Sequence, residues 1–190
     1  MIDFSPVNNK EIPWEEFAVK FTKQDLVKHI NDMTDKVLEL IADCTDAIVS
    51  FQPKDPEAHD PFAENPEDED LAWNLGHVIV HLTASSEESA FIAAELARGV
   101  TIEPRRSRSE LPWETITTVQ QCRDRLAESR RMLLASLEMW PDEPNLDNFY
   151  ETKGGTKVKT VHRFLYGQSH ADGHFKQIEE IVRQAKEAMG

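Results

Sequence analysis

The chain has 190 residues, 39% of them hydrophobic and 29% charged, which is typical of one globular domain that buries a core without disulfides or metal. Its net charge of −14 repels phosphate backbones and anionic lipids, and this argues against a nucleic-acid partner. No apolar run approaches the length of a membrane span and the first residues lack the pattern of a signal peptide, so we expect no membrane association and a cytoplasmic location.

Residues 1–21 carry aromatic side chains and two prolines without a regular period, which indicates an N-terminal arm on a single domain spanning 1–190. A first helix is predicted from Thr22, which suits an N-cap with Asp25 three residues later. Its apolar residues recur in steps of three and four as far as Ile48. The segment 52–70 is acidic and holds four prolines, so it is predicted to be a long connection in which His59 is solvated.

A second helix is predicted from about Glu67 to Arg98, with Gly99 as its end signal. One flank of its apolar face carries polar side chains that suit a functional site: His77, His81, Glu88 and Glu95. The connection that follows is long enough to cross a helical bundle rather than turn tightly. It has a basic centre, which favours a solvated loop over an anion site: Arg105, Arg106 and Arg108.

The remaining chain predicts two more helices. One runs from about Trp113 to Met139, and the last from Thr160 to Ala185. Between them, NFYET and TKVKT flank a Gly-Gly pair and are expected to form a short hairpin. Four long amphipathic helices predict an all-α four-helix bundle with long connections and a small hairpin before the last helix. Cys44 and Cys122 fall on apolar helix stripes, which favours buried free thiols over a disulfide or a catalytic cysteine.

The last predicted helix contains the strongest functional signal, the pair His170 and His174. Residues four apart lie on one helical face, so the two imidazoles can share a metal ion. The same spacing also arises by chance or in two solvated side chains, and a third ligand must come from another helix. A bundle allows His77 or His81 to face this pair across a groove. Three such ligands plus water are typical of catalytic zinc, whereas four close the site and indicate a structural role.

The stretches WNLGHVIVHLTAS and HADGHFKQI resemble the DinB-like (YfiT-like) superfamily of metal-binding four-helix bundles. The residues that stand at the family's positions are Trp73, His81-Leu82, His170, His174 and Gln177-Ile178. The resemblance implies that His81, His170 and His174 hold a divalent metal, zinc or nickel, with water completing the shell. Two departures are the Phe175-Lys176 pair, where Arg-Gly is common, and the extra imidazole of His77. We favour a supporting or solvated role for His77 over a fourth ligand.

The resemblance further implies a metal-dependent transferase or related enzyme that activates a small-molecule thiol, or water, toward an electrophilic substrate. A neutral three-histidine site lowers the pKa of a bound thiol or water. Glu88 is a candidate catalytic base or partner for an imidazole, against the simpler alternative of an exposed carboxylate. HVIVH and HADGH lack the glutamate of H-E-x-x-H, so a zincin protease is not supported.

Two other functions stay open from the sequence. One is a non-enzymatic metal-binding or stress-linked bundle, as a monomer or a homodimer. The other is haem binding through His81 or His170, which would give a Soret absorbance on purification. The non-enzymatic bundle differs from the enzyme in whether its ion has a coordination position open to a small thiol.

Overall fold

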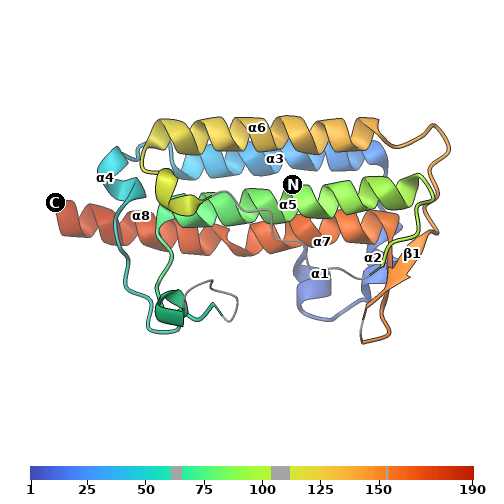
Figure 1. Cartoon of the computed structure of the whole chain (residues 1–190), viewed down its shortest axis with the longest axis horizontal. Helices are drawn as coiled ribbons and strands as arrows, with labels where there is room; N and C mark the ends of the chain where they lie inside the picture. The colour runs from blue at the N-terminus through green and yellow to red at the C-terminus, as the bar shows by residue number, and fades with distance from the viewer. Residues whose placement is uncertain (61–65, 104–111, 153) are drawn as a thin grey trace.

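The computed structural model describes residues 1–60, 66–103, 112–152 and 154–190. It confirms the predicted all-α bundle, because long helices lie side by side along one axis (Figure 1). The four rods of the bundle are α3 (Lys23–Leu40), α5 (Leu75–Ala97), α6 (Val119–Glu138), and α7 (Thr160–Gly173) continued by α8 (Phe175–Met189). Helix α5 packs against α6 and α7, while α3 packs against α6 and α8.

Helices α5 and α6 run in the same direction, and α3 and α7–α8 run in the opposite one (Figure 1). The chain between α5 and α6 therefore has to return along the bundle, as its length predicts. The three arginines at the centre of this connection, Arg105, Arg106 and Arg108, lie outside the described residues. Their interpretation as a solvated loop stays a prediction.

The first predicted helix begins as expected but ends early. Thr22 and Asp25 form a reciprocal capping box, in which the Asp25 N–H donates to Thr22 Oγ1 at 3.3 Å and the Thr22 N–H donates to Asp25 Oδ2 at 2.8 Å. Helix α3 then stops at Leu40, and the chain resumes as the short helix α4 (Asp46–Val49). The break frees Asp46 to accept the Val119 N–H at 2.9 Å, which caps the start of α6.

The second and third helices begin later than their apolar periods predict. Asn74 is the N-cap of α5 because its side chain accepts the His77 N–H at 2.9 Å, and the residues before it contain only a 3₁₀ turn at Pro66–Asp68. A capping box between Thr118 and Gln121 likewise starts α6. A separate 3₁₀ turn, η2 (Trp113–Thr115), precedes it. At both helix starts, the capping hydrogen bond and not the apolar period thus decides the first residue of the helix.

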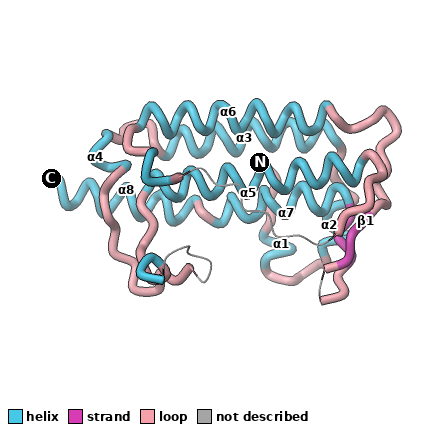
Figure 2. The backbone as a smooth tube through the Cα atoms, in the orientation of Figure 1, coloured by secondary structure: helices cyan, strands magenta, loops and turns pink. Residues whose placement is uncertain are grey.

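The hairpin before the last helix is confirmed. Strand β1 (Phe149–Glu151) pairs antiparallel with β2 (Lys157–Lys159), with Tyr150 opposite Val158. Figure 2 places this small sheet at one end of the bundle. In the turn between the strands Gly155 has a φ of +80°, a conformation that side chains with a Cβ rarely adopt.

The last predicted helix is interrupted at His174. The His174 N–H bonds to the carbonyl of Ala171 at 3.1 Å, three residues back, and α8 restarts at Phe175. A bond to the third residue back closes a turn with fewer residues than an α-helical turn, and this turn separates α7 from α8. The interruption falls at His174 itself, so the second histidine of the pair lies at the junction of α7 and α8.

The core consists of two apolar clusters. One joins α3, α5, α6 and α8, and the other joins the opposite half of the bundle to the N-terminal segment, which contains α1 (Ser5–Asn8) and α2 (Trp14–Ala18). Cys122 is buried, Cys44 is half-buried, and both are free thiols. Burial raises the pKa of Cys122 to about 12, so this thiol stays protonated. Within the described segments, no helix has the length and apolar character needed to cross a membrane.

Candidate metal centre

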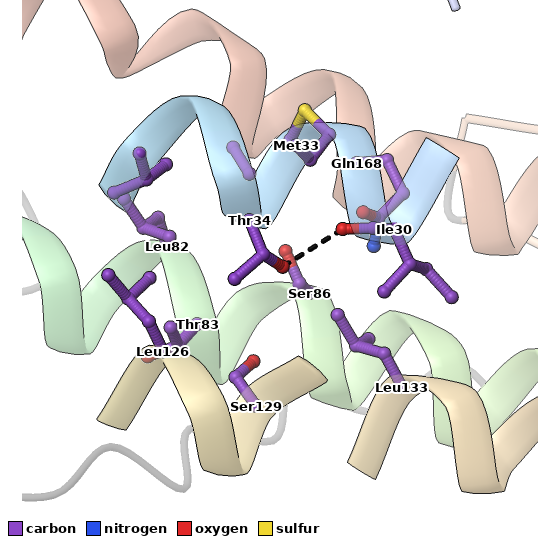
Figure 3. Close-up of a pocket in the computed structure, with 12 residues that line it drawn as sticks. Ile30, Met33, Thr34, Leu82, Thr83, Ser86, Leu126, Ser129, Leu133 and Gln168 are labelled. Carbon is purple, nitrogen blue, oxygen red and sulfur yellow. Dashed lines mark hydrogen bonds between the residues drawn. The ribbon is translucent and has the colours of Figure 1, made fainter. Parts of the chain in front are cut away.

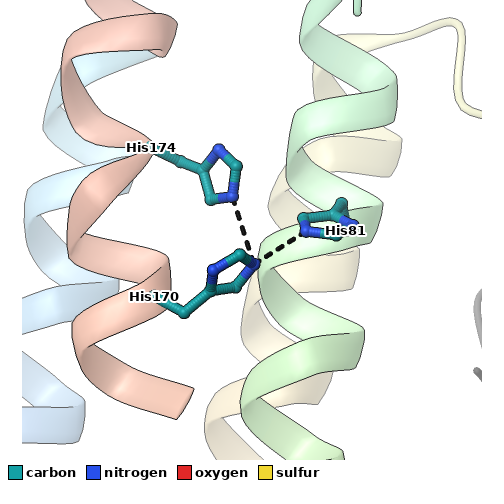
Figure 4. A group of neighbouring side chains, drawn as sticks. All are labelled: His81, His170 and His174. Atoms are coloured by element: carbon teal, nitrogen blue, oxygen red, sulfur yellow. Dashed lines mark hydrogen bonds between the residues drawn. The ribbon is translucent and has the colours of Figure 1, made fainter. Parts of the chain in front are cut away.

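Three imidazoles from two rods of the bundle converge between α5 and the α7–α8 rod (Figure 4). Nε2 of His170 lies 2.8 Å from Nε2 of His81 and 3.4 Å from Nε2 of His174. One ring nitrogen from each histidine lies within 4.8 Å of the other two. Of the histidines, cysteines and acids that the structure describes, these three form the group able to hold a metal ion. The structure thus brings together the residues that the sequence predicts.

The spacing of the nitrogens fits a metal ion. Bonds of about 2.0–2.1 Å to a tetrahedral zinc ion place two ligand nitrogens about 3.3 Å apart. The distances from His170 Nε2 to the other two Nε2 atoms, 2.8 and 3.4 Å, lie on either side of that value. A neutral imidazole has one N–H and one lone pair, so three converging Nε2 atoms cannot all satisfy one another by hydrogen bonding. An imidazole donor set suits zinc and nickel among the common metals.

Gln177 orients His174. Its Oε1 lies 2.8 Å from Nδ1 of His174, and an amide oxygen only accepts, so Nδ1 carries the proton and the lone pair of Nε2 points at the other histidines. Burial lowers the pKa of His174, the hydrogen bond that His174 donates to Gln177 opposes this, and the Coulombic interaction with His81 adds to the lowering. The neutral ring, which is the form that binds metal, is therefore favoured.

The three histidines differ in their access to solvent. His81 is buried with 8% of its surface exposed, His174 is half-buried, and His170 is exposed. The group therefore has a closed side within the bundle and an open side at the surface. A site of this kind leaves room for a water molecule or a substrate atom beside the three protein ligands.

An aromatic stack flanks the group on its α5 side. The ring of His77 lies between the indoles of Trp73 and Trp113, at centroid distances of 4.3 and 4.6 Å, and its plane is 1° from that of Trp113. Trp73 also lies 4.5 Å from the ring of His81 and 6.0 Å from that of His174. His77 is not one of the three converging residues. Its position in the stack agrees with the supporting role favoured from the sequence.

The acidic residues on α5 lie farther away. Glu88 is half-buried and stands two helical turns from His81, about 10 Å along the helix axis. Its role as a base stays a prediction. The buried acid on this helix is its neighbour Glu87, whose Oε2 accepts from Arg125 Nη2 at 2.7 Å. His59 is exposed beside Asp70, as a solvated histidine should be.

Three features of the site were not identified as functional from the sequence. They are the hydrogen bond from Gln177, the position of Trp113 and the buried pair of Glu87 with Arg125. Gln177 stands three residues after His174, and this i, i+3 spacing was the available signal. The other two depend on contacts between separate elements, for which a single sequence holds no local signal.

The family model of the DinB superfamily matches residues 17–178. The chain belongs to the DinB superfamily. The match contains all three converging histidines, extends from α2 into the first turn of α8, and confirms the resemblance seen in the sequence. No curated protein and no solved structure matches the chain significantly. The assignment of this DinB-superfamily protein to a reaction therefore depends on the geometry of its own site.

Proposed function

We propose that this DinB-superfamily protein is a metal-dependent enzyme in which His81, His170 and His174 hold a zinc or nickel ion. The observation that carries the proposal is the convergence of their three ring nitrogens, with His170 exposed on one side. A divalent ion held by neutral imidazoles keeps its full charge and lowers the pKa of a thiol or water that it binds. The reaction class we propose is transfer of a small-molecule thiol, or of water, to an electrophilic substrate.

The protein's own residues prepare the site for this chemistry. Gln177 keeps the proton of His174 on Nδ1, so Nε2 is available at neutral pH. Trp73 packs beside the rings of His81 and His174, with ring centroids 4.5 and 6.0 Å away, and restricts how these two rings can turn. The exposed side, at His170, is where a substrate thiol can enter. The lack of an ionised protein ligand among the three preserves the positive charge that attracts a thiolate.

Metal analysis tests the site. The protein purified without chelators is expected to contain about one zinc or nickel ion per chain. His81→Ala and His170→Ala should each remove it, whereas His59→Ala, at an exposed histidine paired with Asp70, should leave it in place. A wild-type protein without metal that also fails to take up added zinc would overturn the proposal. A Soret band instead of zinc or nickel would support haem.

A cobalt-substituted protein tests the open position. We expect its visible spectrum to change when cysteine or dithiothreitol is added, because a thiol that enters the coordination shell alters the ligand field. A bound ion whose spectrum responds to neither thiol would contradict thiol activation. That result would favour the alternative of a non-enzymatic metal-binding bundle.

The cytoplasmic location and a homodimer are proposals that rest on the sequence and the family resemblance. The acidic composition supports the location. Cell fractionation tests the first, and light scattering of the purified protein tests the second. A monomer at micromolar concentration would contradict the dimer without affecting the metal site.

A further inference from the structure

The bundle contains a small cavity between its four rods, lined by apolar side chains together with several polar ones (Figure 3). Its volume is about 20 Å³, which is room for about one water molecule. Polar side chains from all four rods line it: Thr34, Thr83, Ser86, Ser129 and Gln168. None of the residues that line it is ionisable. The cavity is therefore suited to a small neutral molecule and not to an ion.

Gln168 leaves one strong donor unsatisfied at this cavity. The residue is 1% exposed, and its Nε2 has no hydrogen-bond partner among the described residues. A buried polar group without a partner carries a cost in stability, because it has lost its hydrogen bonds to water. An acceptor inside the cavity would remove this cost, and the volume limits that acceptor to the size of water.

The hydroxyl groups supply the complementary acceptors. Thr34 Oγ1 donates to the carbonyl of Ile30 at 2.9 Å, and Ser86 Oγ donates to the carbonyl of Gly167 at 3.5 Å. Because each hydroxyl proton is directed at a backbone carbonyl, the lone pairs of these oxygens remain free to accept. A molecule that accepts from Gln168 and donates to two hydroxyls has the hydrogen-bonding pattern of water.

We propose that this cavity binds one ordered water molecule, which accepts a hydrogen bond from Gln168 Nε2 and donates to the hydroxyl oxygens of Thr34 and Ser86, which Figure 3 shows side by side near Gln168. Buried waters typically make two to four such bonds. The water joins α7 to α3 and α5 through a residue that precedes His170 by two positions. It is independent of the metal ion, because none of the three histidines lines the cavity.

A crystal structure of the full chain at about 1.5 Å tests the proposal, since buried waters are well ordered at sites with several polar partners. We expect a density peak within hydrogen-bond distance of Gln168 Nε2 and of the hydroxyls of Thr34 and Ser86. Absence of a peak there, while other buried waters of the same crystal are visible, would overturn it.

Two further measurements separate the role of Gln168 from that of the cavity. In wild-type protein, the Gln168 side-chain amide protons should show a direct rotating-frame Overhauser cross-peak to water, of opposite sign to chemical exchange; absence of this cross-peak counts against the site. Gln168→Met keeps the side-chain length and removes the donor, so the density peak should be lost. A peak of full occupancy in this variant would show that the hydroxyls bind water without Gln168 and would contradict the proposed role of the amide.

Discussion

Gly167 of α7 lies so close to Ser89 of α5 that a Cβ on the glycine would overlap the Cβ and Oγ of the serine. The same Cβ would lie 3.3 Å from the carbonyl oxygen of Ser85. This contact allows the two helices to approach at the level of their backbones. Because His81 and His170 come from these two helices, the missing side chain at position 167 helps to set the distance between their ring nitrogens.

Gly167→Ala should push α7 away from α5 and weaken metal binding without changing a ligand. We expect a loss of about 1–3 kcal/mol in the free energy of unfolding, as in other overpacked interiors. Urea denaturation and zinc titration measure the two effects. Gly173→Ala is the matched control, since a Cβ there meets nothing within 4 Å, and helix propensity predicts a gain of up to about 1 kcal/mol. Equal behaviour of the two variants would contradict this role of Gly167.

The buried pair of Glu87 and Arg125 should be costly to break from one side. Their side chains are 10% and 9% exposed, so removal of one partner leaves an uncompensated charge in the bundle. Arg125→Met is expected to lower the free energy of unfolding by about 3–5 kcal/mol, whereas the double variant with Glu87→Leu should recover most of it. Arg183→Met, at an exposed pair with Glu180, is the control and should have no measurable effect in urea denaturation. A double variant as unstable as Arg125→Met would refute the argument.

Stability should fall in mild acid because of buried histidines. The ring of His162 stacks on Trp14 at 4.9 Å, and burial lowers its pKa from 6.5 to about 4. The unfolded chain therefore binds more protons than the folded one between these values, and the folded state loses stability as pH falls from 6.5 toward 4. His29, which accepts the Ile2 N–H on Nδ1 at 3.0 Å, shows the same direction, with a pKa of about 4.

His162→Phe keeps the stack and removes the proton. Between pH 7 and pH 5 the wild type should lose about 2 kcal/mol more free energy of unfolding than the variant does. Urea denaturation at the two pH values measures this difference. Parallel pH profiles for the two proteins would mean that His162 titrates in the folded protein as it does in the unfolded chain, and would contradict the effect of burial.

The stack of His77 between Trp73 and Trp113 predicts that ring shape matters more there than the imidazole nitrogens. His77→Phe should keep the metal and most of the stability, while His77→Ala should lose about 1–3 kcal/mol from the two aromatic contacts. Zinc titration and thermal unfolding of both variants provide the measurement. A Phe variant that folds normally but binds zinc at least tenfold more weakly would instead support His77 as a fourth ligand.

The bundle and the pair of His170 and His174 were predictable because each depends on a regular period, and the hairpin was predictable because a Gly-Gly pair marks its turn. Apolar steps of three and four locate α3, α5, α6 and the last rod, and the spacing of His170 and His174 is itself helical. That His81 joins them was implied by the family resemblance, whereas bundle geometry alone left His77 equally eligible.

The helix ends were not predictable from the same period. Asn74 and Thr118 start their helices through side-chain hydrogen bonds, although apolar residues continue in phase before them. The end of α3 before Ile48 depends on Asp46 reaching the start of α6, which is a contact between distant segments. The interruption at His174 is likewise a backbone event, and no proline or positive-φ glycine marks it.

The unequal exposure of the histidines has a consequence for how an ion would be exchanged. Since His170 is at the surface, a chelator or a competing cation can reach the group while the helices stay packed. Loading would then equilibrate in the native protein, and the occupying element would follow its free concentration in the surroundings rather than the order of events during folding.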